Sequence, residues 1–473
     1  MSGLQPETRR ALGIMLREME QTVMPELNSA HAKTVAHLIG RGLRNLLTRE
    51  EGLPELLEKW SSLEAELIIS TGQALPRQAA GDMVTRNQAL GEAVEAIIIE
   101  RMKAKATLDD FCKSAIEAEG NFYQAHEQSL NSVSLPQRTP ERRDLLAMTP
   151  ERLTAYFARK LPQYKALCVT GVTPILSGFS KQTMLVDMEA DNVAMPVVIR
   201  RDIPYGAVST SVVDEYPLVA ALHRQGLPVP EPVLLETDVS EFGEAFSVTR
   251  RAPGVAATNA MAGLVAGPEM TTAAYALAAF LARQHRINLD ALALPKKLYD
   301  PAMATHDYLI REIDICERYY RNHRLQPSPT ITAALAWLRN NVPQVEGPPR
   351  LVHGDASLNN VMMDGDKLSV MLDWELWHPG DPVEDVTYTR KWIDQFMSWD
   401  DFLARYYQHG GPQYLPEREK FYAMLSDLRV ALFATRTQDM LNKGDHPEIT
   451  HMYAAQHYYG YFIGNVAKSL INS

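Results

Sequence analysis

The first 128 residues carry hydrophobic side chains at helical spacing almost throughout. Leu12, Leu16, Met19 and Val23 recur every three or four positions, which is typical of a helix with one buried face. The same spacing returns at residues 35–47, 56–69, 83–99 and 108–123. This pattern predicts an all-α helical-bundle domain over residues 1–128, followed by a Ser- and Pro-containing linker at 129–149.

After residue 150 the pattern changes from helices to strands. A helix is expected at 150–160, with Thr149 as its N-cap and Pro150 in its first turn. The β-branched content and the turn residues then predict three antiparallel strands at 169–176, 183–189 and 194–201. A helix at 214–222, an extended connector at 226–233 and a strand at 245–249 complete this segment.

Helical spacing dominates again beyond residue 253, at 271–286, 308–324 and 330–341, and from 386 to the end. The exception is residues 351–375, where short apolar strand patterns alternate with polar groups. The whole pattern therefore predicts an α+β chain, with a small antiparallel sheet and a mainly helical remainder.

Composition narrows the class of protein. Hydrophobic residues make up 46% and charged residues 22% of the chain, as in ordinary soluble globular proteins. The formal net charge of -11 argues against nucleic acid as the main partner. The three cysteines are too widely separated for a disulfide framework or a zinc site, and neither a signal peptide nor a membrane-spanning apolar run is evident. We therefore expect a cytoplasmic protein without a membrane or nucleic-acid partner.

The strongest chemical signal lies in residues 351–375. Asp355 is followed five residues later by Asn360, and Asp373 comes directly after the apolar run 368–372. Phosphoryl transfer from a nucleotide requires a carboxylate to accept the proton of the attacking hydroxyl, and oxygen ligands to hold Mg²⁺. Asp355 fits the first role, and Asn360 and Asp373 fit the second. A surface β-hairpin turning at 364–366 is the alternative, but it would not require polar residues in this order at both strand ends.

These motifs resemble the aminoglycoside phosphotransferase and choline kinase superfamily. The resemblance rests on His353-Gly354-Asp355 with Asn360, and on Asp373-Trp374-Glu375 where protein kinases carry Asp-Phe-Gly. It implies a bilobal protein-kinase-like fold, with an antiparallel N-lobe at 150–252 and a helical C-lobe at 253–473 that holds the catalytic loop and the acceptor pocket. The sequence Arg200-Arg201 resembles the one often found at this position in one branch of the superfamily. That branch is related to the kinase domains fused to some acyl-CoA dehydrogenases.

The resemblance also implies a nucleotide site. A loop before the second strand would present backbone N–H groups to phosphate oxygens. Arg200 stands where kinases carry the phosphate-binding Lys, and Glu215 would be its ion-pair partner. Thr249 would be the gatekeeper of the hinge. The remaining implied nucleotide-binding residues are Ser177, Gly178, Ser180 and Lys181 in the loop, and Arg250 and Ala252 in the hinge.

Support for the catalytic loop is expected from His353, Asp381 and Asp385. The implied cofactor is Mg²⁺, with ATP or GTP as phosphoryl donor. The acceptor stays open: a hydroxyacyl-CoA or another catabolic hydroxyl compound is favoured by the branch, and an antibiotic such as an aminoglycoside or macrolide is the alternative. A nucleotide-binding pseudokinase or interaction module is an alternative of another class.

The N-terminal helical domain shows no chemistry of its own. Homodimerisation, partner docking and formation of one wall of the substrate cleft are all open roles for it. His31, His37 and His126 lack the paired spacing of a helical zinc site and are interpreted as structural or solvated.

Overall fold

A computed structural model describes residues 39, 53–76, 83–103, 108–129, 147–175, 180–204, 206, 208, 210–258, 268–443 and 454–471. The expected helices before residue 53, the linker up to residue 146, and His31 and His37 lie outside these residues. The chain divides into two compact units, 1–141 with 310–343 and 423–473, and 142–309 with 344–422. We call them the helical unit and the mixed unit.

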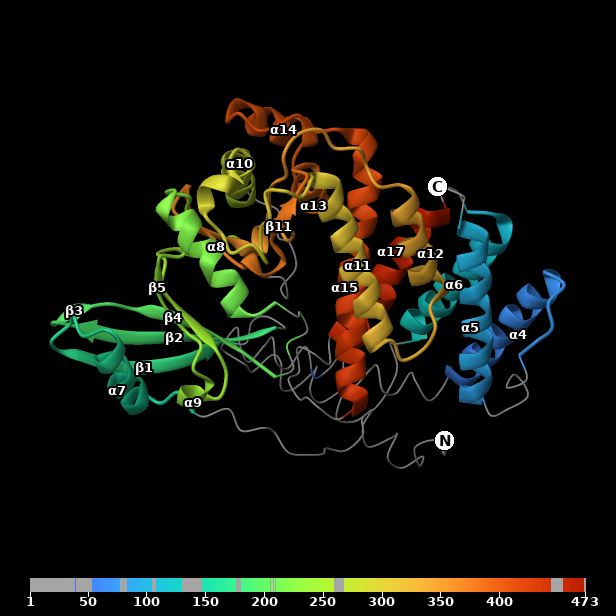
Figure 1. Ribbon diagram of the computed structural model, residues 1–473, viewed down its shortest axis with the longest axis horizontal. Helices are drawn as coiled ribbons and strands as arrows, with labels where there is room; N and C mark the ends of the chain where they lie inside the picture. Colours follow the sequence, from blue (N-terminus) through green and yellow to red (C-terminus); the bar gives the residue numbers. More distant parts are fainter. Residues whose placement is uncertain are drawn as a thin grey trace. The chain divides into compact units, whose positions relative to one another are not determined.

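The mixed unit is built on an antiparallel sheet with strand order β1-β2-β4-β6-β5, and β3 pairs with β2 (Figure 1). Its strands are β1 Leu167–Ile175, β2 Lys181–Ala190, β3 Val193–Ala194, β4 Val197–Asp202, β5 Pro232–Glu236 and β6 Phe246–Arg250. The strands expected from sequence are confirmed. β5 begins in the stretch expected to be an extended connector, 226–233, and continues beyond it to Glu236. Its proline at position 232 stands at the first residue of an edge strand, where no ladder N–H is needed.

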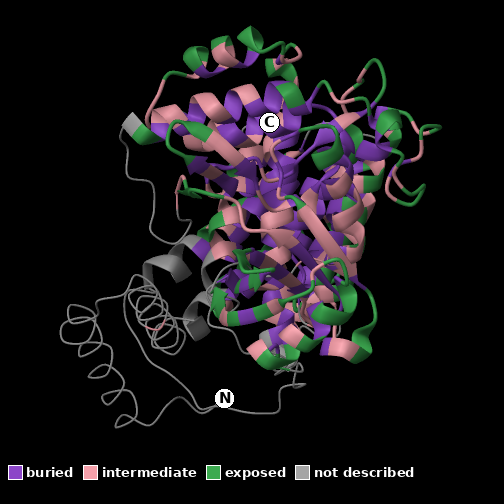
Figure 2. Cartoon of the chain, turned by 90° about the vertical axis from the view of Figure 1, so that its left-hand side faces the viewer, coloured by how far each residue is buried: buried purple, intermediate pink, exposed green. Residues whose placement is uncertain are grey.

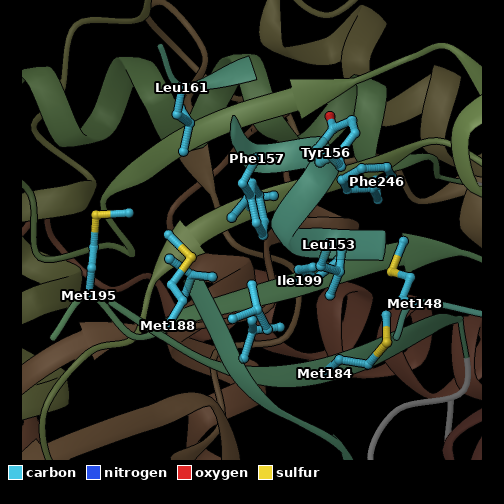
Figure 3. Close-up of a cluster of buried hydrophobic side chains, with 14 of the residues drawn as sticks. Met148, Leu153, Tyr156, Phe157, Leu161, Met184, Met188, Met195, Ile199 and Phe246 are labelled. Carbon is cyan, nitrogen blue, oxygen red and sulfur yellow. The ribbon is translucent and has the colours of Figure 1, made fainter. Parts of the chain in front are cut away.

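Burial alternates along the sheet. In β4, Val197 and Ile199 face the core, whereas Arg200, the next residue, faces the other side. Helix α7 (Pro150–Lys160) covers the core face with Tyr156 and Phe157, as Figure 3 shows. Thr149 caps this helix by accepting a hydrogen bond from the backbone N–H of residue 152. The expected cap is thus confirmed.

The rest of the mixed unit is mostly helical. Its helices are α8 Val212–Arg224, α9 Val239–Phe242, α10 Pro268–Gln284, α13 Val383–Ile393 and α14 Trp399–Gln408. The same unit also contains two small antiparallel sheets. One consists of β10 Lys367–Met371, β9 Val361–Asp364 and β7 Val255–Ala256. The other consists of β8 Arg350–Val352 and β11 His378–Gly380. Short 3-10 turns occupy Leu289–Leu292, Leu358–Asn360, Trp374–Leu376 and Pro416–Arg418. Together these elements confirm an α+β architecture.

The helical unit combines helices from three separate parts of the sequence. It contains α4 Leu53–Ser70, α5 Met83–Met102, α6 Asp110–Ser129, α12 Pro329–Asn340 and α17 Tyr459–Ile471, with a π-helical turn at Ala454–Tyr458. Helices α11 Thr305–His323 and α15 Glu419–Lys443 contribute residues to both units. Figure 2 shows buried residues concentrated on inner helix faces. The compact unit therefore differs from the expected domain at 1–128, because α12 and α17 pack on α5 and α6. Within the described residues, no helix combines the length and apolar character needed to cross a bilayer.

Buried glutamates join α12 to the N-terminal helices. Glu95 Oε1 accepts hydrogen bonds from the Tyr320 hydroxyl at 2.7 Å and the Ser328 N–H at 3.1 Å. Glu119 Oε2 accepts from the Thr330 N–H at 2.8 Å. Both carboxyl groups thus bind N–H groups at the beginning of α12, where unpaired donors and the helix dipole favour negative charge.

A third glutamate in this cluster has no such partner. Glu64 is 3% exposed, and its Oε1 has no hydrogen-bond partner among the described residues. Burial, followed by repulsion from Glu119 and Glu95, raises the pKa of Glu64 to about 8. Glu64 is therefore mostly protonated in the folded protein at neutral pH.

Glu64→Gln should stabilise the helical unit at alkaline pH. An unfolded chain loses the Glu64 proton near pH 4.5, the ordinary pKa of a glutamate, whereas the folded protein keeps it to about pH 8. The free energy of unfolding should fall with rising pH between these values, by up to about 1.4 kcal/mol per pH unit from this group. Urea-dependent hydrogen exchange of α4 to α6 measures this slope. The slope should shrink in Glu64→Gln and stay unchanged in Glu66→Gln, an exposed control on the same helix. Equal slopes in both variants would contradict the assignment.

Candidate active site

The catalytic loop is anchored by a buried carboxylate at the first turn of α13. Asp385 is 0% exposed and accepts the backbone N–H groups of His353 at 2.8 Å and Gly354 at 2.9 Å. It also accepts the Gln284 amide N–H at 2.8 Å and lies 3.1 Å from His285 Nε2. Burial alone would raise the pKa of Asp385, but the contacts with His285 and His353 outweigh it and lower the pKa to about 2. Asp385 therefore stays charged and fixes the loop backbone.

His353 ties the same loop to the strand that precedes Asp373. Its Nε2 lies 2.9 Å from the Leu372 carbonyl oxygen. Its Nδ1 accepts a hydrogen bond from the Asp355 backbone N–H, with 3.2 Å between the two nitrogen atoms. Gly354 has φ of 82°, and a Cβ there would overlap the Leu376 carbonyl oxygen. Glycine is therefore required between the histidine and the aspartate of the motif.

Asp381 has a different set of partners. Its carboxylate accepts the Val383 N–H at 3.1 Å, the Arg418 guanidinium at 2.9 Å and the Tyr422 hydroxyl at 2.9 Å. Within the described residues, these hydrogen bonds join the beginning of α13 to the turn at 416–418 and to α15, and none of them reaches the catalytic loop. Support of the loop itself comes from His353 and Asp385.

Asp355 and Asn360 are brought together as the motif requires. The Asn360 amide N–H donates to the Asp355 backbone carbonyl and to its Oδ2, both at 2.9 Å. Burial and the nearby charge of Asp373 raise the pKa of Asp355 to about 6. A hydrogen bond from Tyr388 on α13 opposes this rise. Asp355 is therefore a carboxylate that is fixed in orientation and has a pKa close to neutral pH.

Arg200 connects the large sheet to helix α8 and to Asp373. Its Nη1 donates to Glu215 Oε1 at 2.5 Å, and its Nη2 donates to Asp373 Oδ1 at 2.7 Å. Glu375 Oε2 lies 3.7 Å from the same Nη2. The predicted ion pair between residues 200 and 215 is present, and the arginine in the usual lysine position reaches two carboxylates at once through its fork.

The loop residues before β2 are only partly described. Ser177 and Gly178 lie outside the described residues. Ser180 donates its hydroxyl to Glu375, and the Lys181 ammonium donates to the Thr210 carbonyl oxygen. The contacts of these two side chains are thus with the protein itself.

The hinge residues Thr249 and Arg250 end β6, and Ala252 follows the strand. Thr249 pairs with residue 198 of β4, and the Arg250 N–H donates to the Glu231 carbonyl at 2.8 Å. The Arg250 guanidinium lies 3.2 Å from the Tyr164 hydroxyl. The Arg250 backbone N–H is thus used by a contact within the protein.

Sequence reasoning missed Glu375 and Tyr388. Glu375 stands inside the motif with Asp373, so its position was visible but its bonds to Ser180 and Arg200 were not. Tyr388 follows Asp385 by three residues, which places the two one helical turn apart. That spacing is the signal that could have found it.

The donor set suits a magnesium ion that arrives with a nucleotide. Across the described ranges there is no cluster of three His, Cys, Asp or Glu arranged for a metal. Mg²⁺ in nucleotide sites needs only one or two protein oxygens, because phosphates and water supply the rest. The Asp373 carboxylate and the Asn360 amide oxygen fit this requirement. Asp373 Oδ1 accepts a hydrogen bond from Arg200 in the structure, and a carboxylate has further lone pairs that could bind a metal.

Comparison with known proteins identifies the family. Residues 171–422 match the phosphotransferase enzyme family. The chain belongs to this family. Acyl-CoA dehydrogenase family member 11 of Gallus gallus is 31% identical over 191 residues, which cover 40% of this chain and 23% of that protein. Member 10 of Mus musculus is 31% identical over 179 residues, covering 37% and 16% respectively. This phosphotransferase thus matches a quarter or less of the length of these relatives.

A solved structure supports the fold. A Ralstonia eutropha protein provisionally described as an aminoglycoside phosphotransferase aligns with a TM-score of 0.50 at 20% identity, covering 67% of this chain and 98% of that one. At this identity the likeness shows the fold alone. It confirms the kinase-like fold, and the family match confirms the resemblance drawn from the catalytic motifs.

Asp385→Asn should destabilise the mixed unit. The substitution keeps the shape but removes a buried charge that accepts the His353 and Gly354 N–H groups, at a cost of about 3 kcal/mol. The pKa of Asp385 is lowered from 3.8 to about 2 in the folded protein. The contribution of Asp385 to the free energy of unfolding of the wild type should therefore be present above pH 4 and lost as the pH falls toward 2. Urea unfolding across this range measures both effects. Asp366→Asn, in the exposed β9–β10 turn, is the control, and equal stability of the two variants would exclude this role.

Proposed function

We propose that this phosphotransferase moves the γ-phosphoryl group of ATP or GTP to a hydroxyl of a small molecule in a Mg²⁺-dependent reaction. The observation that carries the proposal is the Asp355–Asn360 pair beside the Arg200–Asp373 ion pair. A carboxylate, an amide, a metal-binding carboxylate and a fixed cation are the protein groups that phosphoryl transfer uses.

Asp355 orients the acceptor hydroxyl and takes its proton. With a pKa of about 6 it is mostly ionised at neutral pH, yet its proton affinity is higher than that of a solvated aspartate. The two bonds from Asn360 hold the carboxylate in one orientation. Most of the rate gain then comes from positioning and charge neutralisation.

Asn360 and Asp373 would hold the magnesium ion, which neutralises phosphate charge when it is bound. Arg200 would steady the phosphates while Glu215 keeps its guanidinium in place. The backbone N–H groups of the loop with Ser177, Gly178 and Ser180 would contact phosphate oxygens. Beyond Thr249, the Arg250 carbonyl and the Ala252 N–H would hold the adenine.

For the acceptor, we favour a hydroxyacyl-CoA or another catabolic hydroxyl compound. The support is the 31% identity to two relatives that are named as acyl-CoA dehydrogenase family members. An antibiotic acceptor is the second candidate, and it rests on the description of the Ralstonia eutropha structure, at 20% identity. The intact set of Asp355, Asn360 and Asp373 argues against a binding module without turnover.

Asp355→Asn should lower kcat by about 10²- to 10⁴-fold, because the variant cannot accept the proton of the hydroxyl. The measurement is Mg²⁺-dependent phosphate transfer from ATP and GTP across hydroxyacyl-CoAs, aminoglycosides, macrolides and amino alcohols. Nucleotide affinity should change little in the variant, and Asp366→Asn should behave as wild type. Absence of transfer across the panel by a wild-type protein that binds nucleotide would support the binding-module alternative instead.

A further inference from the structure

Lys181 is a buried cation whose oxygen neighbours come from three separate segments. Its ammonium donates to the Thr210 carbonyl, and it lies 3.8 Å from Asp202 Oδ1 and 3.6 Å from Glu375 Oε2. The side chain is only 3% exposed. Removing a charged amine from water is costly unless such oxygens replace the lost hydration.

Two of these neighbours contact or adjoin the beginning of α8: Thr210, and Asp202 at the end of β4. Thr210 directly precedes the N-cap, Ser211, whose hydroxyl accepts the Val213 N–H at 3.1 Å. Asp202 Oδ1 accepts the Val212 N–H at 3.0 Å, and its other oxygen accepts the Ser211 hydroxyl. Lys181 therefore contacts both the residue before α8 and the carboxylate that caps this helix.

Helix α8 in turn carries Glu215, the partner of Arg200. The third neighbour of Lys181, Glu375, lies two residues after Asp373, which Arg200 also binds. Lys181 and Arg200 stand on the same face of the sheet, since they are opposite Asp202 and Thr183 in the antiparallel register of β2 and β4. Lys181 thus bridges the cap of α8 and the turn that follows Asp373.

We propose that Lys181 is a positioning residue that fixes the beginning of α8 against the Asp373–Glu375 turn and thereby aligns the Arg200–Glu215 ion pair for phosphate binding. This inference rests on the proposed phosphotransferase function. It replaces direct phosphate binding as the role of Lys181. Contact with a phosphate would require the ammonium to leave acceptors that are themselves buried or half-buried.

Lys181→Met tests this role. The variant removes the ammonium but keeps an unbranched chain, and Lys165→Met is an exposed control in the same unit. Hydrogen exchange of the α8 amides should become about tenfold faster or more in Lys181→Met only, because the beginning of the helix loses its contact with the sheet. ATP affinity should fall in the same variant, because phosphate binding depends on the aligned Arg200. Unchanged α8 exchange in the nucleotide-free Lys181→Met protein would overturn the proposal, because a direct phosphate contact would leave this exchange unaltered.

A double-mutant cycle with Glu215→Gln adds a kinetic readout. Each single substitution should lower kcat, and the double variant should be no more than about threefold below the worse single variant, because both act through Arg200. Effects that multiply would overturn the proposal. If Lys181→Met does not fold, Asp202→Asn should loosen the same α8 amides, and unchanged exchange there would count equally against it.

The exchange experiment separates the two proposals. Suppose that α8 exchange is faster in Lys181→Met but the wild type transfers phosphate to no acceptor. This result would support the contact between Lys181 and the beginning of α8 and reject the phosphotransferase activity. Transfer by the wild type with unchanged exchange in the variant would retain the activity and reject the role of Lys181.

Discussion

A single guanidinium determines how the parts of the mixed unit meet at the site. Arg200 projects from β4, binds Glu215 on α8 and binds Asp373 after β10. A cation in this position needs carboxylate partners to offset its lost hydration, and the two partners come from segments far apart in the sequence. The sheet, helix α8 and the turn after β10 are therefore held in one arrangement by charge pairing. Asp373 has φ of 64°, a strained region for a residue other than glycine, which agrees with a backbone held in place by its surroundings.

The same principle recurs around the catalytic loop and in the helical unit. Asp385 accepts backbone N–H groups from the loop and stays ionised, whereas Glu95 and Glu119 accept N–H groups at the beginning of α12. Each buried carboxylate thus satisfies backbone donors that would otherwise be unpaired. Glu64 Oε1 has no hydrogen-bond partner among the described residues, and burial with repulsion from Glu119 and Glu95 raises the pKa of Glu64.

The sequence was sufficient to predict features with local signals. Apolar spacing predicted helices such as α5 and α12, β-branched alternation predicted β2 and β4, and Thr149 predicted the beginning of α7. The motif spacing predicted the Asp355–Asn360 contact, and family resemblance predicted the Arg200–Glu215 pair. The compact helical unit could not be predicted, because it depends on long-range packing of α12 and α17 with α5 and α6.

The partners of individual polar side chains were equally inaccessible. Asp381 and Asp385 stand four residues apart in one motif, yet only Asp385 binds the backbone of the catalytic loop, because Asp381 precedes α13 whereas Asp385 lies in its first turn. Lys181 was expected to bind phosphate from its place beside a glycine loop, but its burial depends on residues 202, 210 and 375. The roles of the nucleotide-binding residues stay predictions.

We propose that Asp373 and the nucleotide phosphates share a magnesium ion. Titration calorimetry of ATP, with and without Mg²⁺, on the wild type and Asp373→Asn tests it without knowledge of the acceptor. We predict that Mg²⁺ tightens ATP binding to the wild type by tenfold or more (~1.4 kcal/mol) and has much less effect on the variant. Equal ATP affinity in both proteins, with no dependence on Mg²⁺, would contradict the account.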